Sequence, residues 1–232
     1  MNKHPDTNYN RFEEIDSEDL EDILMQIEHS FEIKFDHDDF LKVTTYGEMC
    51  DVIFSKVELA NNNGCTSQQA FYKLRMAIAD TFSIDSGIIK SDTLIENIVP
   101  RKNRIRMIKE LKRNLGINLK ILSPPLWFII ADIVLFLLGL CAFFFSWKIA
   151  VVIIVISVLG FIIGDVFGKE IDFETVRDLV KEMIHKHYLK SRRDKLTVNK
   201  EEMQQILDDI LIETFYLERS SLVRDVKFGW IK

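Results

Sequence analysis

The feature that most constrains this chain is a nearly continuous apolar stretch from Pro124 to Gly168, interrupted by full charges only at Asp132, Lys148 and Asp165. One membrane crossing needs about 20 apolar residues, so the stretch is long enough for two. Backbone polar groups in hydrocarbon must be bonded internally. We therefore expect two helices, 126–145 and 149–167, joined by a tight turn at 146–148. The alternative is a buried hairpin in a soluble protein, but apolar residues cover every face of both helices.

The charges that flank this stretch predict its orientation. Eight Lys and Arg lie between Arg101 and Lys120, against the single Glu110, whereas only Lys148 lies in the turn. Basic residues next to a crossing remain in the cytoplasm. The sequence therefore predicts a protein integral to the cytoplasmic (inner) membrane, with both termini in the cytoplasm and membrane lipids as its neighbours.

Two sets of residues inside the stretch are candidates for function or for packing. Asp132 and Asp165 both fall in the half nearer the cytoplasm, and ionisable groups in a membrane are expensive. They either handle a solute or proton or simply reach interfacial water. Gly160, Gly164 and Gly168 recur every four residues, a spacing that permits close helix packing. We expect these glycines to pack against the first helix of the same hairpin rather than in an oligomer.

The remainder of the chain has the periodicity of amphipathic helices, so the predicted fold class is all-α: a two-helix transmembrane hairpin with helical cytoplasmic domains. Residues 1–15 are expected to be disordered, and the polar run 189–199 is expected to be a linker. Helix starts are indicated by capping pairs three residues apart, namely Thr45 with Glu48, Thr66 with Gln69, Thr175 with Asp178, and Asn199 with Glu202.

Composition argues against several classes of function. The formal net charge is −6 and the first 60 residues are strongly acidic, which argues against nucleic acid as a partner. Cys50, Cys65 and Cys141 lack the spacing of metal ligands, and His185 and His187 have no further ligands near them in sequence. With no catalytic dyad, phosphate loop or metal cluster in the pattern, we expect no enzymatic activity.

Residues 16–60 carry a recognisable order of features. Asp16-Ser17 opens a helix that runs to Phe31, followed by the loop EIKF and a helix that begins TTYGEMCDVIF. This order resembles acyl carrier proteins, in which an Asp-Ser-Leu motif opens the second helix and its serine holds 4'-phosphopantetheine. The resemblance implies that Ser17 is the attachment site, with Asp16 beside it. Glu18 stands where the family has leucine, which argues against modification, and a simple helix cap is the alternative role for Ser17.

The family's first helix is missing ahead of Asp16, but residues 199–232 resemble that helix and its long loop. They are expected to complete 16–60 as a circularly permuted module. A second, degenerate copy is predicted in 65–122, completed by the helix in 173–190 after the hairpin at 124–168 (helices 126–145 and 149–167). Pro100 and Arg101 occupy its Asp-Ser places, so this copy cannot carry the prosthetic group.

The resemblance implies a membrane-anchored protein that carries or docks acyl groups, or lipid-synthesis partners, at the cytoplasmic membrane face. The acidic first module would attract basic acyl-transfer or lipid-synthesis enzymes by electrostatic steering. Two other functions stay open. One is an unmodified scaffold that uses the fold only to bind partners, and the other is a small channel or transporter subunit built on Asp132 and Asp165.

Overall fold

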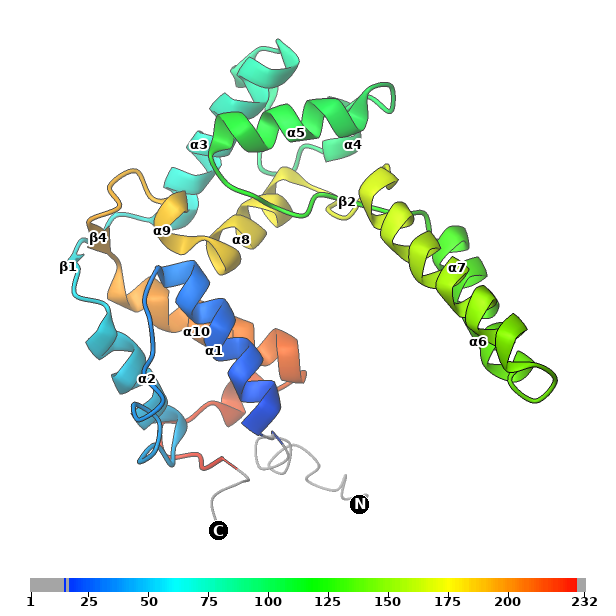
Figure 1. The fold of residues 1–232 in the computed structure, drawn as a ribbon. Coiled ribbons are helices and arrows are strands. Elements are labelled where there is room, and N and C mark those ends of the chain that lie inside the picture. Colours follow the sequence, from blue (N-terminus) through cyan, green and yellow to red (C-terminus); the bar gives the residue numbers. More distant parts are fainter. Residues whose placement is uncertain (1–14, 16, 229–232) are drawn as a thin grey trace, which may run out of the picture. The chain divides into compact units, whose positions relative to one another are not determined.

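The computed structural model describes residue 15 and residues 17–228. This part of the chain is mostly helical, with ten α-helices and four two-residue strands, which confirms the predicted helical character (Figure 1). Contacts divide the chain into two units. The first contains the residues up to Lys73 and those from Val180 onward, and the second contains Leu74–Leu179. The boundaries fall inside α3 (Thr66–Phe82) and α8 (Val176–Lys186).

The first unit joins the two ends of the chain around one apolar core. Its helices are α1 (Ser17–Phe31), α2 (Tyr46–Lys56), α9 (Tyr188–Ser191) and α10 (Lys200–Phe215), with a 3-10 turn at Arg219–Ser221. Helix α10 contacts both α1 and α2. The side chains buried between these helices come from all three of them: Leu20, Ile23, Ile27, Phe31, Met49, Ile53, Met203, Ile206, Leu207, Ile210 and Leu211. Strand β1 (Ala60–Asn61) pairs in parallel with β4 (Thr197–Val198).

The segment after α10 runs along the start of α2. Lys227 forms an antiparallel bridge with Thr45, and the amide of Gly47 donates to the carbonyl of Arg224 at 2.8 Å. A Cβ on Gly47 would lie 2.8 Å from that carbonyl oxygen, so the close approach of the two backbones requires glycine. The predicted capping box between Thr45 and Glu48 is present.

The second unit contains the apolar hairpin and the helices before it. In chain order these elements are a 3-10 turn (Ser86–Ile88), α4 (Ile95–Ile98), α5 (Arg104–Leu115), β2 (Leu122–Ser123), α6 (Leu126–Ala142), α7 (Trp147–Phe167) and β3 (Glu170–Ile171). Strands β2 and β3 pair antiparallel at the base of the hairpin. There the buried guanidinium of Arg104 donates to the carbonyls of Lys169 at 2.7 Å and Val99 at 2.9 Å.

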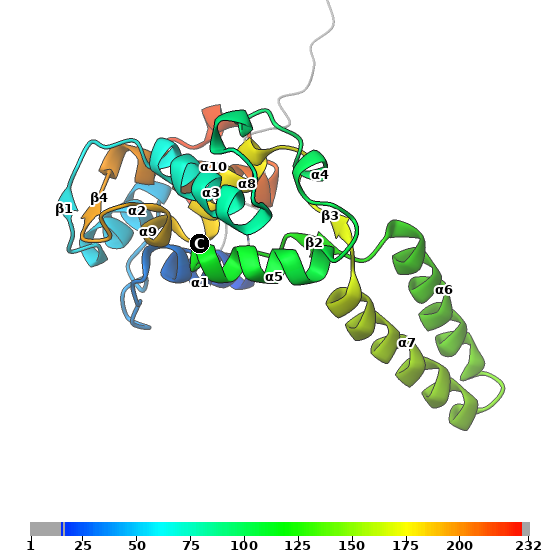
Figure 2. The same ribbon diagram turned by 90° about the horizontal axis from the view of Figure 1, so that it is seen from above.

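Helices α6 and α7 lie side by side and antiparallel in both ribbon views (Figures 1 and 2). The predicted boundaries need one correction, because the turn lies at residues 143–146 rather than 146–148. The amides of residues 143–145 bond to carbonyls three residues back, which tightens the end of α6 at Ala142. Ser146 is then extended, with φ −160°, and α7 begins at Trp147.

The glycines of α7 pack within the hairpin, as their spacing predicted. A Cβ on Gly160 would lie 2.9 Å from Oδ1 of Asp132, and one on Gly164 would overlap the ring of Phe128. A Cβ on Gly168 would overlap the backbone that leads into α6. All three glycines therefore face the first helix or its entry, so that the two helices can approach closely.

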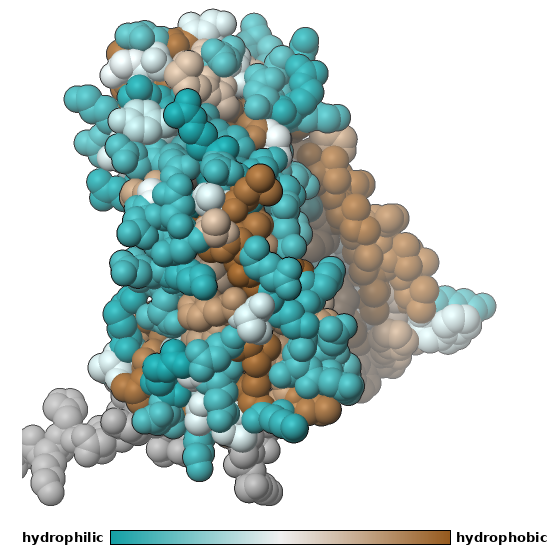
Figure 3. Space-filling model, turned by 90° about the vertical axis from the view of Figure 1, so that its left-hand side faces the viewer, coloured by the Kyte–Doolittle hydropathy of each residue, from teal (hydrophilic) through white to brown (hydrophobic). Residues whose placement is uncertain are grey.

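The part of the hairpin surface visible in Figure 3 is apolar except at its far end, where hydrophilic residues lie. Helix α7 is long and apolar enough to cross a membrane, and only 17% of its most apolar stretch is buried. Helix α6 is also apolar but has 17 residues. Trp127, in the first turn of α6, is 70% exposed. In the turn that follows the helix, Phe144 and Phe145 are 91% and 90% exposed.

Other predictions need correction outside the hairpin. The expected linker 189–199 packs into the unit at both ends, since Leu189, Ser191, Arg192, Val198 and Asn199 are buried, whereas residues 193–196 are exposed. Residues 1–14 of the segment expected to be disordered lie outside the described residues. Ile15, the last residue of that segment, is only 4% exposed. The capping box expected at the start of α3 does not form.

That box fails because both side chains have other partners. Thr66 lies inside α3, where its hydroxyl binds Arg192, and the side chain of Gln69 accepts a hydrogen bond from the amide of Arg193 at 2.8 Å. At α10 only half of a box forms. Asn199 caps the helix, but the carboxylate of Glu202 accepts from the amide of Thr66 instead.

Candidate functional site

The candidate attachment residue, Ser17, is the first residue of α1. Asp16 and the side chain of Ser17 lie outside the described residues. Helix α1 ends at Phe31, as predicted, and Glu32 then adopts a left-handed conformation with φ 51°, which turns the chain away from the helix axis.

A cavity of about 390 Å³ lies between α1 and the loop that follows it. Its apolar lining comes from the middle of α1 and from the loop: Leu20, Leu24, Met25, Phe35, Phe40, Leu41 and Val43. Glu21, Glu28, Asp36 and His37 contribute polar groups. A volume in this range with a mainly apolar lining and a few polar groups is typical of small-ligand sites.

Two carboxylates hold the loop that forms this cavity. Glu28 of α1 accepts from the amide of Phe35 at 2.6 Å and pairs with Lys34 at 2.9 Å. The pKa of Glu28 is lowered mainly by the hydrogen bond from the Phe35 amide and, to a smaller extent, by the positive charge of Lys34. Asp39 accepts from the amide of Asp36 at 2.7 Å and pairs with Lys56 at 2.6 Å, and Lys56 is the main cause of its lowered pKa. The loop is thus attached to both α1 and α2.

The first two turns of α1 present an acidic surface. Glu18, Asp19, Glu21 and Asp22 are all exposed, and Met25 beside them is 58% exposed. Acidic residues near a helix N-terminus are favoured by the helix dipole. The surface that borders the cavity can therefore attract a positively charged partner.

The second unit repeats two local features of the first. The loop after α3 meets the start of α8 through an antiparallel bridge between Leu94 and Thr175, as Lys227 meets Thr45 in the first unit. Thr175 and Asp178 form reciprocal hydrogen bonds like those of Thr45 and Glu48. Each Thr-led helix is therefore joined to the segment that follows another helix, α10 for α2 and α3 for α8.

Arg101, one of the two residues at the Asp-Ser places of the predicted second copy, has a structural partner. Pro100 and Arg101 precede α5, and the guanidinium of Arg101 donates to Glu170 at 2.5 Å. This ion pair is largely exposed, so it contributes little stability by itself.

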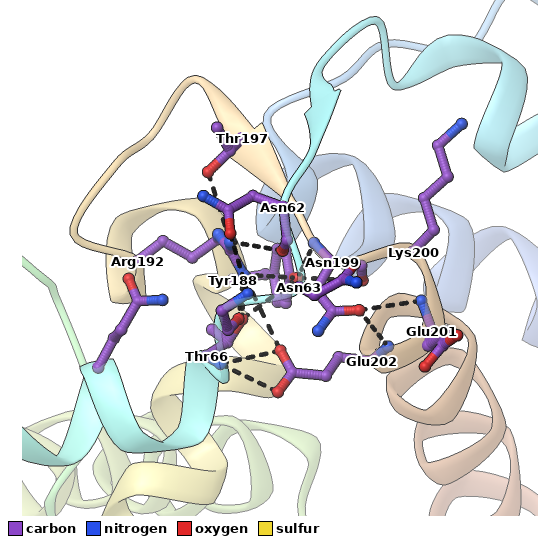
Figure 4. A network of polar contacts seen from close by, with 12 residues as sticks. Asn62, Asn63, Thr66, Tyr188, Arg192, Thr197, Asn199, Lys200, Glu201 and Glu202 are labelled. Atoms are coloured by element: carbon purple, nitrogen blue, oxygen red, sulfur yellow. Dashed lines mark hydrogen bonds and ion pairs between the residues drawn. The ribbon is translucent and has the colours of Figure 1, made fainter.

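Arg192, which no sequence pattern singled out, is the centre of a buried polar network in the first unit (Figure 4). Its guanidinium donates to the hydroxyl of Thr66 and, at 3.3 Å each, to the carbonyls of Asn62 and Gly64. The carboxylate of Glu202 lies 3.9 Å away. Arg192 is 2% exposed, although it lies in the polar run that pattern alone assigns to a linker.

The same network positions the start of α10. The hydroxyl of Tyr188 accepts from the amide of Asn199 at 2.9 Å and from Arg192 at 3.3 Å. Asn199 in turn accepts from the amides of Glu201 and Glu202 at 3.1 and 3.2 Å. The network joins residues 188–202 to Asn62, Gly64 and Thr66, which lie far earlier in the chain, and no local spacing indicates that contact.

The two intramembrane candidates, Asp132 and Asp165, do not form one site. Asp165 pairs with Lys120 at 2.5 Å near the end of α7. The carboxylate of Asp132 faces Gly160, and the hydroxyl of Ser157 donates to its backbone carbonyl at 3.2 Å.

The three cysteines are free, and the rings of His29 and His187 lie edge to face with their centroids 4.7 Å apart. Within the described residues, no group of three or more His, Cys, Asp and Glu side chains could hold a metal ion. Cys50 is buried and its pKa is raised mainly by that burial, whereas Cys65 and Cys141 are exposed. Burial lowers the pKa of His185, and Glu213 at 3.7 Å only partly opposes this effect.

Comparison with known proteins gives no relative from which a role could be transferred: no family model, curated protein or solved structure matches this chain.

Proposed function

We propose that this chain is a membrane-anchored, acyl-carrier-like protein that carries or docks acyl groups at the cytoplasmic face of a membrane. The observation that carries the proposal is the apolar cavity beside α1, the helix that begins at Ser17. Leu20 and Leu24, which line the cavity, follow position 17 by three and seven residues, the spacing of one helix face. A prosthetic group on Ser17 would start on the face of α1 that borders the cavity.

Such a protein holds its cargo and leaves the chemistry to partners. The thiol of the prosthetic group would carry the acyl chain, and the cavity would shelter part of that chain from water. The acidic surface of Glu18, Asp19, Glu21 and Asp22 would attract basic acyl-transfer or lipid-synthesis enzymes, because complementary charge raises the rate of encounter. We propose no catalytic role for the chain itself.

We further propose that both α6 and α7 cross the membrane. Helix α6 rises roughly 26 Å over its 17 residues, and the apolar turn that begins at Phe143 extends it towards the ~30 Å of a hydrocarbon core. The exposed apolar side chains cover both helices, and two antiparallel crossings would place all of this surface in lipid. The basic segment 101–120 would keep both flanks in the cytoplasm.

Cysteine labelling checks this topology. In a variant with Cys65 and Cys141 changed to serine, Ser146→Cys should react with an impermeant maleimide in intact cells, because it lies in the turn. Ser221→Cys, in the first unit, should react only after permeabilisation. Labelling of Ser221→Cys in intact cells, or of Ser146→Cys only after permeabilisation, would contradict the predicted orientation.

Intact mass tests carriage at Ser17. After co-expression of the full chain with a phosphopantetheinyl transferase, we expect a mass increase of one phosphopantetheine group, and Ser17→Ala should abolish it. The matched control is Ser86→Ala, in the 3-10 turn of the other unit, where no residue is buried. This control should leave the mass increase unchanged.

Glu18→Leu separates an active carrier from a degenerate one. Modification of this variant alone would indicate a carrier fold that has lost recognition by the transferase. If neither the unchanged protein nor Glu18→Leu is modified, carriage is excluded. The acidic surface and cavity would then serve docking alone.

A further inference from the structure

We propose that a second cavity, at the base of the hairpin, binds the phosphate headgroup of one anionic phospholipid. The proposal rests on the membrane crossing proposed above and adds a ligand to it. The cavity, about 460 Å³, is formed by α5, by the segment between α5 and α6 and by the end of α7, all within the second unit.

Three lysines from two segments line this cavity. Lys109 and Lys112 lie three residues apart on α5, which places them on neighbouring turns of one face, and Lys120 comes from the following segment. Lys120 is paired with Asp165 at 2.5 Å. Among the described residues neither Lys109 nor Lys112 has a carboxylate partner, so the cavity keeps two uncompensated positive charges.

The environment of Lys112 favours an anion. Its ammonium lies 3.5 Å from the side-chain oxygen of Asn118, which is neutral. Partial burial lowers the pKa of Lys112, because desolvation disfavours its charged form. A phosphate between Lys109 and Lys112 would restore the lost stabilisation of that charge.

The apolar part of the lining points to a lipid rather than to a soluble phosphate. Ile105 and Leu122 line the same cavity as the lysines, and so does Val166, which is 60% exposed on the last turn of α7. Trp127, 70% exposed, lies in the first turn of α6, at the same end of the hairpin. Tryptophan is enriched at the level of lipid headgroups. Phosphate and the adjoining acyl chains would therefore meet the lysines and the apolar residues together.

Lipid binding to the purified full chain in neutral detergent tests this proposal. We expect phosphatidylglycerol to bind by native mass spectrometry and phosphatidylcholine to bind much more weakly. The variant Lys109→Gln/Lys112→Gln should bind phosphatidylglycerol roughly 30-fold more weakly, the loss expected for about 1 kcal/mol per lysine. The matched variant Arg106→Gln/Arg113→Gln removes two charges from the same helix outside the cavity and should change the affinity less than about 3-fold, because exposed charges away from the bound phosphate are screened by salt.

Each other outcome overturns the proposal. Equal losses in both double variants would indicate general attraction to a basic surface, and equal binding of the two lipids by the unchanged protein would exclude headgroup selection. Competition by glycerol phosphate at the concentration of the lipid would indicate a site for soluble phosphate. Resistance of the protein to carbonate extraction from membranes reports separately on the crossing, so a failure of the membrane anchor is distinguishable from a failure of this site.

Discussion

Replacing Arg192 with methionine should lower the free energy of unfolding of the first unit by about 3–5 kcal/mol, the loss seen when one partner of a buried charged network is removed. Methionine can fill much of the space of the arginine stem but donates no hydrogen bonds. The hydroxyl of Thr66 and the carbonyls of Asn62 and Gly64 would each lose a donor. The carboxylate of Glu202 would also lose its nearby positive charge.

Arg193→Met is the matched control for this change. Arg193 is exposed, and its contact with Gln69 is made by its backbone amide, which the substitution keeps. We expect the control to change the free energy of unfolding by less than about 0.5 kcal/mol. Urea unfolding measures both variants, and hydrogen exchange should show faster exchange at the amide of Thr66, which donates to Glu202, and at Asn199 only for Arg192→Met.

Equal stability of Arg192→Met and Arg193→Met would show that the network contributes no net stabilisation. Replacing every member of a buried charged network by apolar residues sometimes leaves the stability unchanged. Here, however, only the arginine is replaced while its acceptors remain, and buried acceptors without a donor are destabilising. Arg192→Lys should fall between the two variants, since lysine keeps the charge but cannot form the same fork of hydrogen bonds.

The second large effect is expected from Gly164→Leu in the hairpin. Even the Cβ of the new side chain would overlap the ring of Phe128, so α6 and α7 would have to separate. Overpacking of this kind costs about 3 kcal/mol, and loss of close packing also removes the van der Waals contacts that hold membrane helices together. We expect a lower melting temperature in detergent and less full-length protein in the membrane fraction.

Val158→Leu is the control for the hairpin. Val158 lies six residues earlier on α7, outside the cavity at the base of the hairpin, and is 49% exposed, so an additional methylene there does not enter the contact between α6 and α7 that Gly164 makes. This variant should retain the melting temperature and membrane yield of the unchanged protein. If Gly164→Leu behaves like this control, the observed pairing of α6 and α7 is not the packed state of the protein. The smaller substitution Gly164→Ala should have an intermediate effect, because the Phe128 ring can rotate or shift more easily for one methyl group.

The two variants also separate the parts of the proposed function. Arg192 is remote in sequence from Ser17, and its network fixes the start of α10, the helix that packs on α1 and α2. Weakening it should loosen the unit that contains the cavity without changing the attachment residue. The hairpin variant affects the proposed anchor, whereas the substituted residue lies outside the first unit.

Local patterns predicted much of this structure from the sequence. The start of α2 after its cap Thr45 and the end of α1 at Phe31 depend on side chains within a few residues, so capping chemistry and apolar periodicity locate them. The apolar hairpin was also evident, because hydrocarbon requires long uncharged helices whatever surrounds them. The position of the turn was not evident from the sequence. Hydrogen bonds from the amides of residues 143–145 to carbonyls three residues back end α6 earlier than hydropathy indicates.

Tertiary structure alone decided which polar residues meet. Arg192 occurs in a run that is indistinguishable from a solvated linker, and it is buried because carbonyls from the segment before α3 and a hydroxyl from α3 surround it. The cavity beside α1 likewise depends on Glu28 and Asp39 holding a loop in place. Asp132 and Asp165 look equivalent in sequence, yet only Asp165 meets a lysine. Periodicity reports the face on which a residue lies, whereas its partners depend on contacts between segments distant in the chain, which no local pattern encodes.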